Sequence, residues 1–227
     1  MKRLSKSISL RLIGLYFFVS LFHFVFIATD NYSGTFVTRF LTPILLLGIY
    51  FSGSSKYNYW FIAGIIATFF SNFFLNFDGN LYGILAILFF IIYRIISIWI
   101  VINFSKRIRL FSVMLGTIPF LTLLTYIIIL TYDSLGFNFY PAILNAILVS
   151  IMSGIALSKF VFEDDVKNNP LILSAILFTI LVVLYMLEHF YMNLKIFAVV
   201  RSVIYVAGHY FFLRYVMLSE PSKGNDS

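Results

Sequence analysis

Eight apolar runs, separated by short polar breaks, constrain the fold of this chain more than any other feature of its sequence. A helix needs about 20 apolar residues to cross roughly 30 Å of membrane hydrocarbon. Backbone polar groups must be paired inside lipid, so we expect each run to be a helix. The expected spans are residues 9–28, 36–52, 58–77, 80–103, 108–131, 138–158, 170–190 and 194–218.

The composition supports the same fold class. Hydrophobic residues make up 61% of the chain and charged residues only 11%, whereas soluble domains carry about 25% charged residues. A water-soluble globule is therefore excluded, and we predict an all-α polytopic helix bundle. We expect one transmembrane domain over residues 1–218 and a short cytoplasmic tail over 219–227. The absence of cysteine excludes disulfides, cysteine nucleophiles and thiolate metal sites.

The positions of the basic residues predict the topology. With the amino terminus inside, all but four of the 16 Lys and Arg residues fall in inner segments, so we expect both termini to be cytoplasmic. This asymmetry explains the net charge of +7 without a nucleic-acid partner. The first apolar run is longer than that of a signal peptide, which favours a retained span. We expect an integral membrane protein of a bacterial cytoplasmic (inner) membrane.

Ionisable residues inside membrane spans are costly and therefore mark candidate functional sites. The last span carries Arg201, Tyr205 and His209 at intervals of four residues, which places them along one helix side. One interpretation is an anion or phosphate site at Arg201, with His209 as a proton carrier. The other is a seam of hydrogen bonds between helices, with Arg201 paired or reaching toward the interface.

Other spans add candidates of the same kind. Asn72 lies in the third span, where its polar spacing favours a structural role, and Arg94 lies past the middle of the fourth span. Glu188 ends the seventh span, and an ion pair between Glu188 and Arg201 across the next turn would explain both residues. Asp78 lies in the break after the third span.

These residues give two sets of site candidates. Glu188, His209 and Asp78 are the candidates for proton transfer, and Arg201, Tyr205, Asn72 and Arg94 are those for substrate binding. The acidic run at 163–165 could attract a divalent cation, although a solvated loop explains it more simply. The histidines lie on separate spans, so we expect no metal and no organic cofactor.

Several short phrases resemble those of the YhhN family, which includes lysoplasmalogenases. The last span is the closest, because Tyr205 to Tyr210 is similar to the family phrase YxxAQY, with His209 in place of glutamine. Thr42-Pro43 is similar to a Lys-Pro of the family but lacks the lysine, and Arg94 stands at a family tyrosine. The resemblance spans roughly residues 10–215 and implies an eight-span membrane bundle.

The resemblance implies hydrolysis of the vinyl-ether bond of lysoplasmalogens, with a lysophospholipid ligand from the membrane lipid. Protonating the vinyl carbon and adding water suits a pair of carboxyl groups. Asn72 and Val182 stand at the two positions where the family carries aspartate. We therefore keep three alternatives: a hydrolase with reassigned acids, a catalytically inactive lipid-binding relative, and a small-solute transporter. The transporter ranks lowest because no internal repeat is evident.

Overall fold

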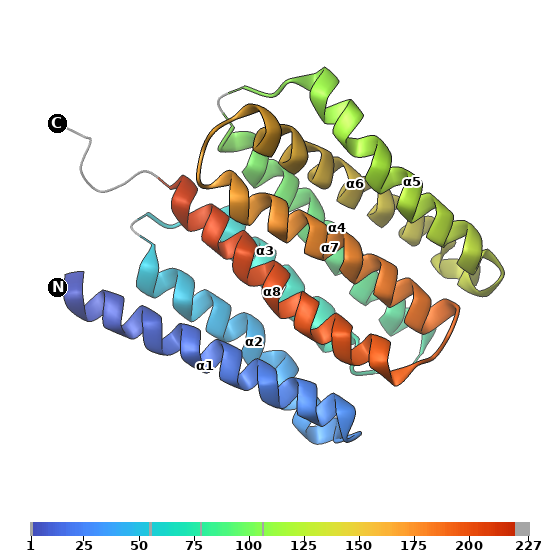
Figure 1. The fold of residues 1–227 in the computed structure, drawn as a ribbon. Helices are drawn as coiled ribbons and strands as arrows, with labels where there is room; N and C mark the ends of the chain where they lie inside the picture. Colours follow the sequence, from blue (N-terminus) through green and yellow to red (C-terminus); the bar gives the residue numbers. More distant parts are fainter. Residues whose placement is uncertain (1, 55, 78, 106, 221–227) are drawn as a thin grey trace.

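The protein is an all-helical bundle. The computed structural model describes residues 2–54, 56–77, 79–105 and 107–220, which form eight α-helices and one short 3-10 helix (Figure 1). The helices are α1 (Lys2–Ala28), α2 (Tyr32–Gly53), α3 (Tyr59–Phe74), α4 (Asn80–Asn103), α5 (Leu110–Leu135), η1 (Gly136–Asn138), α6 (Phe139–Phe162), α7 (Asn168–Phe190) and α8 (Lys195–Ser219).

Consecutive helices pack as four hairpins: α1 with α2, α3 with α4, α5 with α6, and α7 with α8. Helix α8 also packs against α1 and α2, and α4 packs against α6, which joins the hairpins into one bundle. In Figure 1, α1 and α2 lie on one side of the bundle and α5 and α6 on the other. The start of α1 and the end of α8 lie at the same end (Figure 1).

The helices have the length and composition of membrane spans. Six helical stretches are long and apolar enough to cross a membrane, and one of them, Leu110–Phe162, comprises α5, η1 and α6. Helix α3 is a shorter apolar helix of 16 residues. The protein is therefore an all-α, multi-pass membrane protein, as the sequence predicts.

Five predicted span boundaries differ from the helix ends by three residues or more. Helices α1 and α2 begin at Lys2 and Tyr32 rather than at 9 and 36, and α6 ends at Phe162 rather than at 158. The other two, at the ends of α3 and α5, have a local reason. The span expected to reach residue 77 ends at Phe74, where the Asn76 side chain donates to the carbonyl of Asn72 (2.7 Å) and so satisfies a helix-end acceptor. The span expected to end at residue 131 continues to Leu135, because the break comes at Gly136, whose φ of 48° favours glycine.

Helices α5 and α6 approach each other closely at two glycines. A Cβ atom added to Gly154 would lie 2.1 Å from Thr117 Oγ1 and 2.8 Å from the Val113 carbonyl oxygen. On the facing helix, a Cβ atom on Gly116 would lie 3.0 Å from the Gly154 carbonyl oxygen. Small residues at such crossings let helix backbones pack tightly in a membrane.

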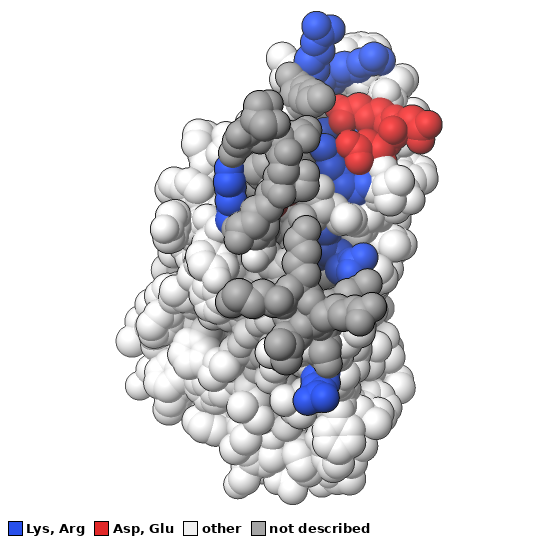
Figure 2. All heavy atoms as spheres, turned by 90° about the vertical axis from the view of Figure 1, so that its left-hand side faces the viewer, with Lys and Arg blue, Asp and Glu red and all other residues white. Residues whose placement is uncertain are grey.

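Charged side chains gather at the end of the bundle where α1 begins and α8 ends. Figure 2 looks onto this end and shows Lys and Arg side chains around it, beside one acidic cluster. Within the 163–165 run, Glu163 pairs with Lys159 (2.7 Å) and Asp165 with Lys167 (3.0 Å). The hydrogen bond from Lys167 lowers the pKa of the Asp165 carboxyl. Two of the three acids of this run are thus already paired with nearby lysines.

Glu220, the first residue after α8, ties the end of that helix to α2. Its carboxylate accepts hydrogen bonds from Tyr50 Oη (2.5 Å) and from Ser54 Oγ. Burial raises the pKa of Glu220, although the hydrogen bonds from Ser54 and Tyr50 act in the opposite direction. The rest of the predicted tail, residues 221–227, lies outside the described residues.

Candidate functional site

A cavity lies inside the bundle, in the half that is away from the start of α1 and the end of α8. Its volume is about 100 Å³, counted as the space that the centre of a water molecule can occupy. One water needs about 10–15 Å³ of such space, so the cavity has room for a polar group larger than a few water molecules. Helices α1, α2, α3, α4, α6, α7 and α8 supply its lining, which includes His23, Ile27, Arg39, Thr42, Asn72, Ala86, Ile87, Phe90, Arg94, Asn145, Leu181, Val182, Tyr185, Ala198, Arg201, Ser202, Tyr205 and Val206.

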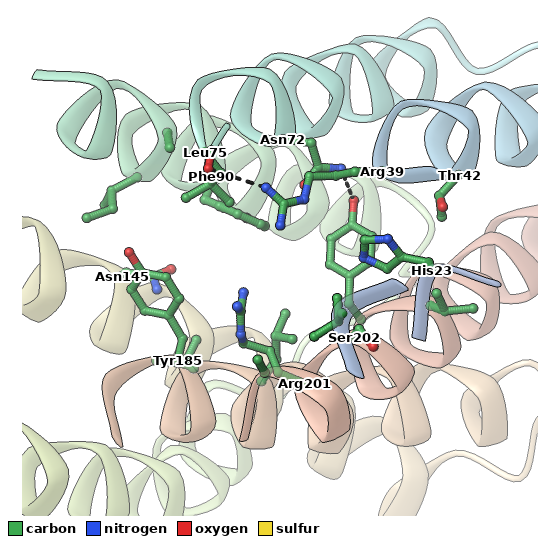
Figure 3. A pocket seen from close by; sticks show the side chains of 18 of the residues that line it. His23, Arg39, Thr42, Asn72, Leu75, Phe90, Asn145, Tyr185, Arg201 and Ser202 are labelled. Carbon is green, nitrogen blue, oxygen red and sulfur yellow. Dashed lines mark hydrogen bonds between the residues drawn. The ribbon is translucent and has the colours of Figure 1, made fainter. Parts of the chain in front are cut away.

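One wall of the cavity is built by Arg39 from α2 and by α3. Arg39 Nη1 donates to Asn76 Oδ1 (2.9 Å) and to the Leu75 carbonyl (3.3 Å). Asn72 Nδ2 donates to Tyr205 Oη (2.9 Å), which connects α3 to α8 across the bundle (Figure 3). These contacts leave Arg39 reaching into the cavity, as Figure 3 shows.

The opposite wall carries Arg201, which forms the ion pair predicted from the sequence. Arg201 Nε and Nη2 donate to the two carboxylate oxygens of Glu188 at 2.7 and 3.0 Å. The guanidinium carbon also lies 5.7 Å from the ring centre of Tyr185. Figure 3 shows Arg201 extending from α8 toward the cavity. A two-bond pair of this kind fixes the arginine and neutralises much of its charge.

Arg94 is the most deeply buried charged group of the site. Arg94 is 1% exposed, and its Nε and Nη1 atoms have no hydrogen-bond partner among the residues that the structure describes. The guanidinium carbon lies 4.0 Å from the ring centre of Phe178. Asn145, on another wall of the same cavity, leaves its Oδ1 acceptor without a partner as well. Unpaired buried polar groups are costly, so these atoms point to a ligand or bound water.

His209 lies beside the site rather than in it. Its Nδ1 atom is 2.8 Å from the Tyr205 carbonyl oxygen, and its ring packs on Tyr205, Tyr93 and Phe178. His209 is 2% exposed and is not among the residues that line the cavity. Over eight residues, a helix advances about 12 Å and turns by about 80° beyond two full turns, which carries His209 away from Arg201.

The structure separates the predicted site residues into groups. It brings the four binding candidates, Arg201, Tyr205, Asn72 and Arg94, to one cavity. Glu188 bonds to Arg201, which lines the cavity, but is not itself among the lining residues. Asp78 lies outside the described residues. Among the residues that the structure describes, no Asp or Glu lines the cavity, and no cluster of three His, Asp or Glu side chains could hold a metal ion.

Sequence reasoning did not assign several lining residues to the site. His23 and Arg39 carried a usable signal, because each is ionisable and lies within or at the edge of a span. In the structure, His23 Nδ1 lies 2.8 Å from Thr38 Oγ1. Asn145 and Tyr185 gave a weaker signal, because an amide and a phenol cost less inside a span than a charged group does.

Comparison with known proteins identifies one match. The profile described as the YhhN family matches residues 34–216, which run from the start of α2 to near the end of α8. The match confirms the resemblance drawn from the sequence, although it begins after α1. Searches of curated proteins and of solved structures gave no match.

Proposed function

The chain belongs to the YhhN family of multi-pass membrane proteins, and we propose that it binds a phosphate-bearing lysolipid from the membrane in its central cavity. The observation that carries this proposal is Arg94, a guanidinium that is 1% exposed, lines the cavity and leaves two nitrogens unpartnered. A buried arginine of this kind matches the oxygens of a phosphate group.

The other lining groups suit the rest of a lysolipid. Apolar side chains such as Ile87, Leu181 and Val206 line the cavity and suit a hydrocarbon chain. The free acceptor of Asn145 suits the glycerol hydroxyl that a lysolipid carries and a diacyl lipid lacks. The ligand is thus expected to place its phosphate at Arg94 and its hydroxyl near Asn145.

Binding without hydrolysis accounts better for the lining residues. Asn72 and Val182, which stand where the family resemblance expects acids, both line the cavity. Neither an amide nor an aliphatic side chain can deliver a proton to a vinyl ether. The described lining contains no carboxyl group that could replace them.

A second candidate function is hydrolysis of a lysoplasmalogen, and one observation favours it. Glu188 holds a carboxylate against Arg201, and Arg201 lines the cavity. If a phosphate replaced Glu188 on Arg201, the released carboxyl could act as an acid. The ion pair argues against this as the resting arrangement, because Arg201 already occupies both oxygens of the Glu188 carboxylate.

We also propose that all eight α-helices cross the membrane, with both termini cytoplasmic and the cavity in the outer half. The Lys and Arg residues at the end of the bundle shown in Figure 2 support this orientation. The cysteine-free chain allows a clean test, since single cysteines can be introduced one at a time. A membrane-impermeant maleimide should label Phe137→Cys in intact cells but Val166→Cys only after lysis; the reverse pattern would refute the orientation.

The binding proposal is tested with purified protein in detergent by isothermal titration calorimetry and native mass spectrometry. Lysophospholipids should bind, and Arg94→Gln should weaken binding at least tenfold, whereas the exposed Arg214→Gln control should not. Aldehyde release from lysoplasmalogen is measured in the same samples. Aldehyde that disappears in Glu188→Gln would favour hydrolysis, and no binding of any lysolipid would refute the proposal.

A further inference from the structure

The charges around the cavity are strongly one-sided. Three arginines, Arg39, Arg94 and Arg201, lie among its described lining residues. Among the described residues, Glu188 neutralises Arg201, while Arg39 bonds to an amide and a carbonyl rather than to a carboxylate. Arg39 is repelled by Arg201 and attracted by the Glu188 carboxylate that pairs with Arg201. Positive charge inside a membrane is costly, so an anion entering this cavity would relieve repulsion as well as form hydrogen bonds.

A positively charged headgroup, by contrast, finds no carboxylate partner among the described lining residues. An ammonium group needs a carboxylate or the open face of an aromatic ring. No described carboxylate lines the cavity. The lining rings are Phe90, Tyr185 and Tyr205. Tyr185 already has the Arg201 guanidinium 5.7 Å from its centre, and Tyr205 packs on the His209 ring at 4.1 Å. A choline or ethanolamine cation would therefore lie among arginines.

The unpartnered atoms add a second requirement. Arg94 offers two free donor nitrogens, and Asn145 offers one free acceptor. A phosphate monoester supplies several anionic oxygens to the arginines, and the adjoining glycerol hydroxyl can donate to Asn145. A fatty acid, with one carboxylate and no hydroxyl, would leave Asn145 unpaired.

From these charges and free atoms we infer that the cavity selects a net-anionic glycerol phosphate headgroup, a phosphate monoester without an attached cation. This inference rests on the proposed binding of a lysolipid and specifies its headgroup class. Arg94 is the group that distinguishes the headgroups, since it lies deepest and is unpaired. Arg39 adds attraction from the wall built by α2 and α3.

The test compares ligands that share one oleoyl chain. Binding of 1-oleoyl lysophosphatidate and 1-oleoyl lysophosphatidylcholine to the full chain in detergent is measured by calorimetry, with glycerol 3-phosphate as the probe without a chain. We expect lysophosphatidate to bind at least tenfold more tightly than lysophosphatidylcholine. Arg94→Gln should abolish most of this ratio, Arg94→Lys should restore part of it, and Arg214→Gln should leave it unchanged.

Each outcome has a separate meaning. Equal affinity for the two lysolipids, or tighter binding of lysophosphatidylcholine, would overturn the headgroup inference and leave lysolipid binding intact. No binding of either lysolipid would overturn the proposed function and this inference together. Binding of glycerol 3-phosphate as tight as that of lysophosphatidate would support the anion site but refute a lipid ligand. A preserved ratio in a folded Arg94→Gln protein would remove Arg94 from the inference.

Discussion

Removing the charge of Glu188 should destabilise the bundle substantially. Its carboxylate makes two hydrogen bonds to Arg201, and the two side chains are only 11 and 21% exposed. Breaking a buried ion pair by removing one partner costs about 3–5 kcal/mol, because the other charge stays buried. Partial exposure favours the lower end, so we expect Glu188→Gln to cost about 3 kcal/mol, which corresponds to a fall in Tm of roughly 6–12 °C.

A double-mutant cycle separates the ion pair from other effects of substitution. Thermal unfolding of the purified protein is followed by circular dichroism for Glu188→Gln, Arg201→Met and the double variant. Because the double variant leaves no unpaired charge, its loss of stability should be smaller than the sum of the single losses by about 1–3 kcal/mol. Additive losses, or a Glu188→Gln protein as stable as the wild type, would refute the role assigned to this pair.

Two further substitutions test features outside the cavity. Gly154→Ala places a Cβ atom 2.1 Å from Thr117 Oγ1, so it should lower the free energy of unfolding by about 1–3 kcal/mol. Gly14→Ala is the matched control, because a Cβ atom at Gly14 meets no neighbouring helix within 4 Å. Equal Tm values for the two variants would contradict the close approach of α5 and α6. Burial raises the pKa of Glu220, so the folded protein favours the protonated form of this carboxyl. The stability that Glu220 contributes is therefore present at low pH and is lost as the pH rises through its raised pKa. Glu220→Gln should therefore gain in Tm relative to the wild type at pH 8 but not at pH 4, and a constant difference across this range would refute the assignment.

The sequence predicted the helices well because the membrane imposes a strong rule on each of them. Each apolar run must pair its own backbone N–H and C=O groups and be long enough to span the membrane hydrocarbon, so hydropathy along the sequence is enough to locate the spans. Two of the boundaries that were wrong depended on single residues. Asn76 closes α3 through a side-chain bond, and Gly136 ends α5 through its backbone angle. Neither the Asn76 hydrogen bond nor the Gly136 backbone angle can be predicted from average hydropathy.

The site was predictable only in part, because one sequence shows depth along the membrane but not the arrangement of helices side by side. The pairing of Glu188 with Arg201 followed from a tight connection between neighbouring helices. The hydrogen bond between Asn72 and Tyr205 joins two residues that are 133 positions apart in the sequence, and no local pattern predicts it. The spacing predicted that His209 lies on the same side of the helix as Arg201. Over the eight residues between them, however, the helix turns by about 80° beyond two full turns. His209 therefore packs against Tyr205 and does not line the cavity.

The position of α8 in the cavity has a consequence for how the protein is made. Arg201 and Tyr205 lie on this last helix, and both meet partners from earlier helices, Glu188 and Asn72. During synthesis, the ribosome releases α8 only after all the other helices have entered the membrane. Until then, Asn72 lacks its Tyr205 partner and Glu188 is an unpaired acid. A chain that stalls or is cut before α8 therefore lacks the partners that this helix gives to both polar groups.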